Sequence, residues 1–174
     1  MGLALRGTST ADTAVPRRRL FLLRFLTFWA LGVSVVALLP EIEELATRGT
    51  VASLASACRL FGLHVSVTGP VIAIGPAAIA IIPDCTPIGP ALALWAAMLA
   101  YPARWGRRAF GMSASLPALW AFNLVRVGSL LGILVAKPSA YDAVHSFLWQ
   151  PATLLAVLGA FAFWVRVLPQ DGGA

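Results

Sequence analysis

The sequence has few charged residues for its length. Only 11% of its 174 residues are Asp, Glu, Lys or Arg, whereas 59% are hydrophobic, and the mean hydropathy is +0.84. This composition excludes an ordinary soluble domain and indicates an integral membrane protein. The net charge of +6 is not accompanied by a basic patch interleaved with aromatic residues, so the sequence gives no reason to expect nucleic acid as a partner.

The motifs of several enzyme classes are also missing. The two cysteines, Cys58 and Cys85, lie too far apart for a CxxC pair, and no Cys/His spacing typical of a metal site occurs. The sequence contains no glycine-rich phosphate loop, HExxH helix or GxSxG elbow. We therefore expect no cofactor and no metal ion. A disulfide between the two cysteines, and with it a thiol–disulfide oxidoreductase, remains an alternative.

Four apolar segments predict membrane spans, at residues 20–39, 87–101, 113–135 and 146–168. A cleaved signal peptide is the alternative for the first segment. That segment is too long for an ordinary signal-peptide core and lacks a small-x-small site before Pro40, so we expect a retained anchor. We predict a disordered cytoplasmic N-terminus (1–19), a single membrane domain (20–168) and a cytoplasmic tail (169–174).

The stretch between the first two spans predicts different structure. Residues 41–63 carry apolar side chains at helical spacing among charged ones, which indicates an amphipathic helix at the outer membrane surface. The β-branched runs that follow are broken by Gly69-Pro70 and Gly75-Pro76, which favours a short β-hairpin over another span. The predicted fold class is therefore an all-α polytopic membrane protein with about four transmembrane helices, an outer amphipathic helix and a short β-hairpin before Cys85.

Arginines predict the orientation of the chain in the membrane. Arg17, Arg18 and Arg19 precede the first span, and a second group lies between the second and third spans: Arg104, Arg107 and Arg108. Because basic residues mark the cytoplasmic side, we expect a multi-pass protein of the inner or plasma membrane with both termini in the cytoplasm. Cys85 and His145 then lie on the outer face.

Cys85 stands at the predicted mouth of the second span. Thr86 is a suitable N-cap, and Pro87 suits the first helical turn. The positive end of the helix dipole there favours the nucleophilic thiolate, whereas the neighbouring carboxylate of Asp84 opposes it. The alternative is a small buried cysteine that only packs.

Arg126 lies within the third predicted span, where a charged side chain costs at least about 2.5–3.5 kcal/mol and is usually functional. Asn123, one helical turn away on the same face, could orient its guanidinium. The alternative is an arginine that snorkels to the headgroups. His145 begins the last span from the outer side, where it could take part in catalysis. The alternative interpretation is a histidine that only lies at the membrane interface.

Together, three segments bring a thiol, a guanidinium and an imidazole to one level at the outer face. Such a set can catalyse acyl transfer: the thiolate attacks a carbonyl, and the other two groups move the proton and stabilise the oxyanion. The residues alone leave open which of Arg126 and His145 has which role.

This ordered set resembles the exosortase/archaeosortase family. The resemblance rests on Ile82-Pro83-Asp84-Cys85-Thr86 before a span, Asn123-Leu124-Val125-Arg126 within the next and His145 at the start of the last, and it covers roughly residues 54–168. One departure is Pro87, since the family commonly has glycine two residues after the cysteine.

The resemblance implies a membrane cysteine protease or transpeptidase that acts on exported proteins. Substrates of the family carry a C-terminal sorting signal of the PEP-CTERM type: a short motif, a transmembrane helix and a basic tail. The family implies an acyl-thioester on Cys85, proton donation by Arg126 and transition-state stabilisation by His145. Expected partners are these exported proteins and membrane lipid, and the acceptor of the acyl group is water, lipid or glycan. The alternative to an enzyme is a membrane adaptor protein without catalytic activity.

Overall fold

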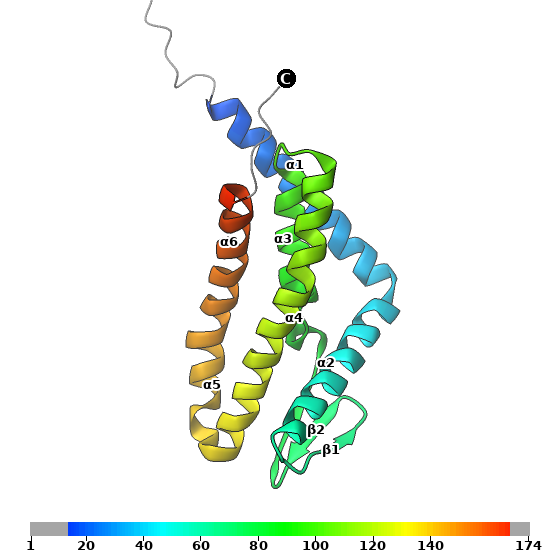
Figure 1. Cartoon of the computed structure of the whole chain (residues 1–174), viewed down its shortest axis with the longest axis vertical. Helices are drawn as coiled ribbons and strands as arrows, with labels where there is room; N and C mark the ends of the chain where they lie inside the picture. The colour runs from blue at the N-terminus through cyan, green and yellow to red at the C-terminus, as the bar shows by residue number, and fades with distance from the viewer. Residues whose placement is uncertain (1–13, 168–174) are drawn as a thin grey trace, which may run out of the picture.

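The computed structural model describes residues 14–167, and most of this stretch is helical (Figure 1). Three helical segments are long and apolar enough to cross a membrane: Arg18–Leu38 in α1 (Ala14–Leu38), α4 (Trp105–Ala136), and the run Pro138–Val167 that ends in α6 (Gln150–Val167). These helices agree with the predicted membrane fold. α1 begins before residue 20, and the predictions for residues 1–13 and 168–174 lie outside the described part of the chain.

The second predicted span is a shorter helix. α3 (Ile88–Ala100) has 13 residues, which at 1.5 Å per residue is about 20 Å, against roughly 30 Å for the hydrocarbon core. Prolines limit it at both ends, since Pro87 is its N-cap and Pro102 follows its last turn. α3 packs against α1, α4 and α6. By length, the described chain thus has three membrane-spanning candidates and a fourth, shorter apolar helix.

α4 begins at Trp105, earlier than the predicted residue 113, because two arginines expected in a loop find partners in the fold. The Arg107 guanidinium donates hydrogen bonds to the carbonyl oxygens of Trp164 (2.8 Å) and Val165 (2.9 Å), and it lies 4.8 Å from the centre of the Trp164 ring. Arg108 donates to the Tyr101 carbonyl at 2.9 Å. These contacts tie the start of α4 to the ends of α6 and α3.

α2 (Pro40–Leu60) is the amphipathic helix predicted at residues 41–63. Its buried side packs on α4 and the sheet, and its acidic residues Glu41 and Glu44 are exposed. The buried residues of α2 recur at helical spacing: Ala46, Thr50, Val51, Leu54, Ala55 and Cys58.

The residues after α2 form a small antiparallel sheet in the order β1 (Ser66–Thr68), β2 (Val71–Ile74) and β3 (Ala77–Ala80). Gly69 and Gly75 make its two turns with φ of 57° and 56°, a backbone region that favours glycine. Short strands are therefore confirmed, although the sheet has three strands where we predicted a two-stranded hairpin. The paired residues Ile72 and Ile79 are buried in a cluster with side chains of α2 and α4.

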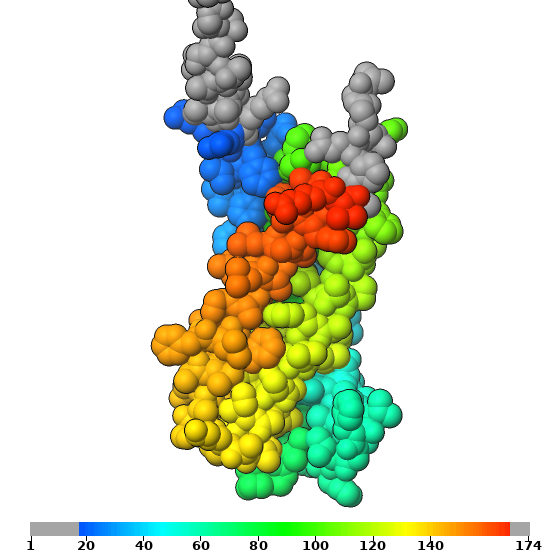
Figure 2. Space-filling view, turned by 60° about the vertical axis from the view of Figure 1, so that its left-hand side comes forward, coloured from blue at the N-terminus to red at the C-terminus, as the bar shows by residue number. Residues whose placement is uncertain are grey.

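The elements give the molecule two distinct ends. The described start of α1, the end of α6 and the α3–α4 connection lie at one end, and the sheet lies at the other (Figure 1). At the sheet end, α4 is followed by η2 (Pro138–Ala140), α5 (Tyr141–Ala143) and the π-helical η3 (Val144–Trp149). Figure 2 shows the run from η3 through α6 lying over α4 on one face of the molecule. α3 begins part way between the two ends, and so do the residues just before it (Figure 1).

Candidate active site

Cys85 lies in the tight turn η1 (Pro83–Cys85), immediately before α3. Hydrogen bonds close this turn: the Cys85 amide donates to the Ile82 carbonyl (2.8 Å), and the Thr86 amide (3.0 Å) and hydroxyl (2.6 Å) both donate to the Pro83 carbonyl. The N-cap of α3 is Pro87 rather than the predicted Thr86, whose hydroxyl lies 3.5 Å from the Ile88 amide and is used mainly to close the turn. Cys85 thus stands at the mouth of α3, half-buried.

Asn123 on α4 holds this turn from the side. Its side-chain amide donates a 2.7 Å hydrogen bond to the Cys85 carbonyl, and only 4% of the residue is exposed. The sequence predicted that Asn123 would orient the Arg126 guanidinium, but its amide is directed at the backbone of the cysteine. A buried hydrogen bond of this kind fixes the position of Cys85 relative to α4.

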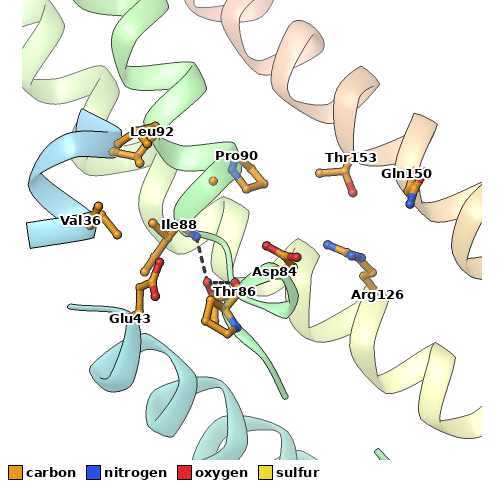
Figure 3. Close-up of a pocket in the computed structure, with 14 residues that line it drawn as sticks. Val36, Glu43, Asp84, Thr86, Ile88, Pro90, Leu92, Arg126, Gln150 and Thr153 are labelled. Atoms are coloured by element: carbon orange, nitrogen blue, oxygen red, sulfur yellow. Dashed lines mark hydrogen bonds between the residues drawn. The ribbon is translucent and has the colours of Figure 1, made fainter. Parts of the chain in front are cut away.

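Arg126 lies one turn further along α4 and is 8% exposed. It lines a cavity of about 430 Å³ together with Asp84, Thr86 and, from α6, Gln150 and Thr153 (Figure 3). Its side chain points across the cavity toward Asp84 (Figure 3). Among the described residues, its Nε atom is buried without a hydrogen-bond partner. A snorkelling arginine would expose its head group, so this placement fits a binding or catalytic group better.

The cavity contains charges of both signs. Arg126 is directed toward the carboxylate of Asp84, in the cysteine turn, and Glu43 on α2 lines the opposite side of the cavity (Figure 3). The two residues next to Cys85, Asp84 and Thr86, both line the cavity. Cys85 itself is not among the described residues that line the cavity, since its side chain packs against the buried cluster of α2, α4 and the sheet.

His145 lies in the π-helical turn η3, a kind of distortion that is frequent at functional sites. Its ring is parallel to that of Tyr141, with 6.0 Å between the ring centres and 1° between the planes. Tyr141 packs against the same buried cluster as Cys85. His145 therefore contacts a neighbour of that cluster, and it is not among the described residues that line the cavity.

Cys58 and Cys85 pack in the same buried cluster, but both are free thiols. Burial raises the pKa of the Cys58 thiol, which keeps it protonated near neutral pH. Cys58 is thus a poor nucleophile, and the described structure holds no disulfide of the kind an oxidoreductase would use. Among residues 14–167, no three His, Cys, Asp or Glu side chains gather as metal ligands.

A larger, apolar cavity of about 730 Å³ borders the polar one. It lies among α1, α2, α3 and α4, and Trp95 and Trp120 are part of its wall. The two cavities share Val36, Ile88 and Leu92, so a polar region at the cysteine turn continues into an apolar region along α3.

The structure therefore joins Cys85 and Asn123 directly, places Arg126 in the adjacent cavity and stacks His145 on Tyr141, which packs against the same cluster as Cys85. Sequence reasoning missed Tyr141. The signal for it was its position four residues before His145, a spacing that brings side chains together on a helix. Nothing comparable in the sequence indicated that the Thr86 hydroxyl would close the turn by donating to the Pro83 carbonyl.

Scans of this chain against protein-family models, curated proteins and solved structures find no match.

Proposed function

We propose that this chain is a membrane cysteine protease or transpeptidase that cleaves a C-terminal sorting signal from exported proteins through an acyl-thioester intermediate. The observation that carries the proposal is the Asn123–Cys85 hydrogen bond, with Arg126 buried one turn further along the same helix. In that arrangement Arg126, with its Nε atom lacking a hydrogen-bond partner, lines a cavity at the mouth of α3 together with the two chain neighbours of Cys85, Asp84 and Thr86. The resemblance to exosortases rests on the same residues.

The chemistry follows from the residue types. The Cys85 thiolate attacks the carbonyl carbon of the scissile peptide, forming a C–S bond and a tetrahedral oxyanion. Collapse of this intermediate breaks the C–N bond, the leaving amine takes up a proton, and the new N-terminus departs. An acceptor with a nucleophilic O–H or N–H group then attacks the thioester and releases the thiol.

Arg126 and His145 divide the remaining tasks. The exosortase resemblance assigns proton donation to Arg126 and transition-state stabilisation to His145. The reverse division suits general chemistry equally, since a guanidinium is a strong oxyanion donor and an imidazole titrates near neutral pH.

The two adjoining cavities suit a substrate of mixed polarity. A sorting signal places a polar motif next to a hydrophobic helix. The motif would occupy the polar cavity at Arg126, and the start of the hydrophobic segment would lie toward the apolar cavity along α3. In the proposed topology α3 counts as the fourth span, both termini lie in the cytoplasm, and the cysteine opens to the outer side.

A cleavage assay tests the proposal. The chain is co-expressed with a reporter protein that ends in a candidate motif, an apolar helix and an arginine tail, and cleavage is followed by gel shift. Wild type and Cys58→Ala should cleave the reporter, because the Cys58 thiol is buried and protonated. Cys85→Ala should not cleave it. Cleavage that persists in Cys85→Ala would exclude the cysteine mechanism.

A further inference from the structure

Tyr141 is one of only two tyrosines in the sequence, and it lies at the sheet end, at the start of α5. It is half-buried and packs against the cluster that also holds Cys85, Val127 and Leu131. It therefore packs, from the connection after α4, against the same buried cluster as Cys85.

The ring of Tyr141 also contacts the imidazole of His145. The parallel planes and the 6.0 Å separation of the ring centres fall within the range of offset-stacked aromatic pairs. His145 belongs to η3, where the backbone departs from regular α-helix. The stack constrains the orientation of the imidazole.

The same side chain packs against the buried cluster on which Cys85 also packs, and this cluster includes Val127, the neighbour of Arg126 on α4. Tyr141 thus contacts His145 with its ring and shares a packing cluster with Cys85.

We propose that Tyr141 is a positioning residue of the candidate site, whose ring fixes the orientation of the His145 imidazole. This inference rests on the proposed function for its catalytic consequence, but the placement of the imidazole can be tested without any substrate.

The first experiment measures how tightly His145 is held. The membrane-embedded full chain is treated with diethylpyrocarbonate, which acylates imidazoles, and the rates at His145 and His64 are read by mass spectrometry. His64 lies exposed between α2 and β1 and is the internal reference. Tyr141→Leu should raise the His145/His64 rate ratio by about 2- to 10-fold, the range expected for one aromatic pair. Tyr141→Phe keeps the ring and should stay within about twofold of wild type on the same grounds.

Controls keep this experiment decisive. Tyr101→Leu removes the other tyrosine, which follows α3 in the α3–α4 connection at the opposite end of the molecule (Figure 1), and should leave the ratio unchanged. If Tyr141→Leu does not accumulate in the membrane, Tyr141→Met replaces it, since methionine fills the volume without a ring. An unchanged ratio in the ring-less variant overturns the proposal, and so does an equal rise in Tyr141→Phe.

The second experiment asks whether Tyr141 acts through His145. In the cleavage assay, Tyr141→Leu should lower the rate about as much as His145→Ala, the double variant should be no slower than His145→Ala, and Tyr141→Phe should restore most of the rate. Additive losses would mean that Tyr141 acts independently of His145 and would overturn this part. If the wild type cleaves no reporter, the proposed function fails while the labelling ratio still decides the placement of His145.

Discussion

Asn123 is the residue that unites the two halves of the site. Its hydrogen bond to the Cys85 carbonyl joins α4 to the turn before α3, and Arg126 extends from the same face of α4. A second hydrogen bond between these helices, from the Trp95 indole to the Ser115 hydroxyl at 3.0 Å, lies away from the cysteine. Removing each of these two hydrogen bonds in turn separates the effect on the position of Cys85 from the effect on α3–α4 packing.

Asn123→Ala should therefore slow cleavage by about 10-fold, because the buried Cys85 carbonyl loses its donor and the turn loosens. Ser115→Ala removes the matched bond and should leave the cleavage rate within about twofold of wild type, although unfolding in detergent will occur at a lower temperature. Rates from the reporter assay and melting temperatures measure the two effects. Equal slowing in both variants would contradict a specific role for Asn123.

Arg126→Lys tests whether the guanidinium serves chemistry. Lysine keeps the charge but loses the planar fork that can hold an oxyanion, so cleavage should fall by about 100-fold or more while membrane insertion is unchanged. Arg24→Lys is the matched control, because Arg24 lies in α1 with its side chain exposed. Full activity in Arg126→Lys would return Arg126 to a structural role.

At the scale of the elements, the sequence predicted those helices and strands that depend mainly on residues close to one another in the chain. Glycine-proline breaks and β-branched runs predicted the strands, and helical spacing predicted α2. The start of α4 was missed because it depends on Arg107 meeting the carbonyls of Trp164 and Val165, more than 50 residues away. Hydropathy marks where a segment can cross a membrane, but it does not detect an arginine that extends a helix through a distant partner.

The α4–α6 contact around Gly111 gives a stability prediction. A Cβ added at Gly111 would lie 2.7 Å from Cδ1 of Trp164, whose indole donates to the Arg107 carbonyl at 3.2 Å. Gly111→Ala should therefore lower the free energy of unfolding by about 1–3 kcal/mol through overpacking.

Gly132→Ala is the control on the same helix, because nothing lies within 4 Å of its added Cβ. It should be neutral or stabilise by up to about 1 kcal/mol through helix propensity. Thermal unfolding in detergent compares the two variants, and equal stability would contradict the packing described for α6.

For the whole molecule, the sequence identified the types of residue in the site better than their contacts. The sequence predicted Cys85, Asn123 and Arg126 as candidates, and in the structure Asn123 donates to the Cys85 carbonyl while Arg126 lies one turn further along α4. The contact of Asn123 with the cysteine turn depends on how α4 packs against a segment 38 residues away, which spacing alone does not encode.

The arrangement of the two ends also predicts the orientation in the membrane. Arg18, Arg19, Arg104, Arg107 and Arg108 belong to the end that holds the described termini, so that end should face the cytoplasm. In a chain with Cys58→Ala and Cys85→Ala, Gly106→Cys should be protected from a membrane-impermeant maleimide in intact cells, whereas Ser139→Cys should react. The reverse pattern would place the cysteine turn away from exported substrates.

The central claim is that Cys85 becomes acylated by the substrate, and trapping that intermediate tests it most directly. Wild-type chain, quenched in acid during turnover of the reporter and digested, should give a Cys85 peptide heavier by the substrate acyl group, and hydroxylamine should remove the added mass. The adduct should be absent from Cys85→Ala and unaffected by Cys58→Ala. A wild type that cleaves the reporter while Cys85 stays unmodified, or an adduct found on Cys58, would contradict the account.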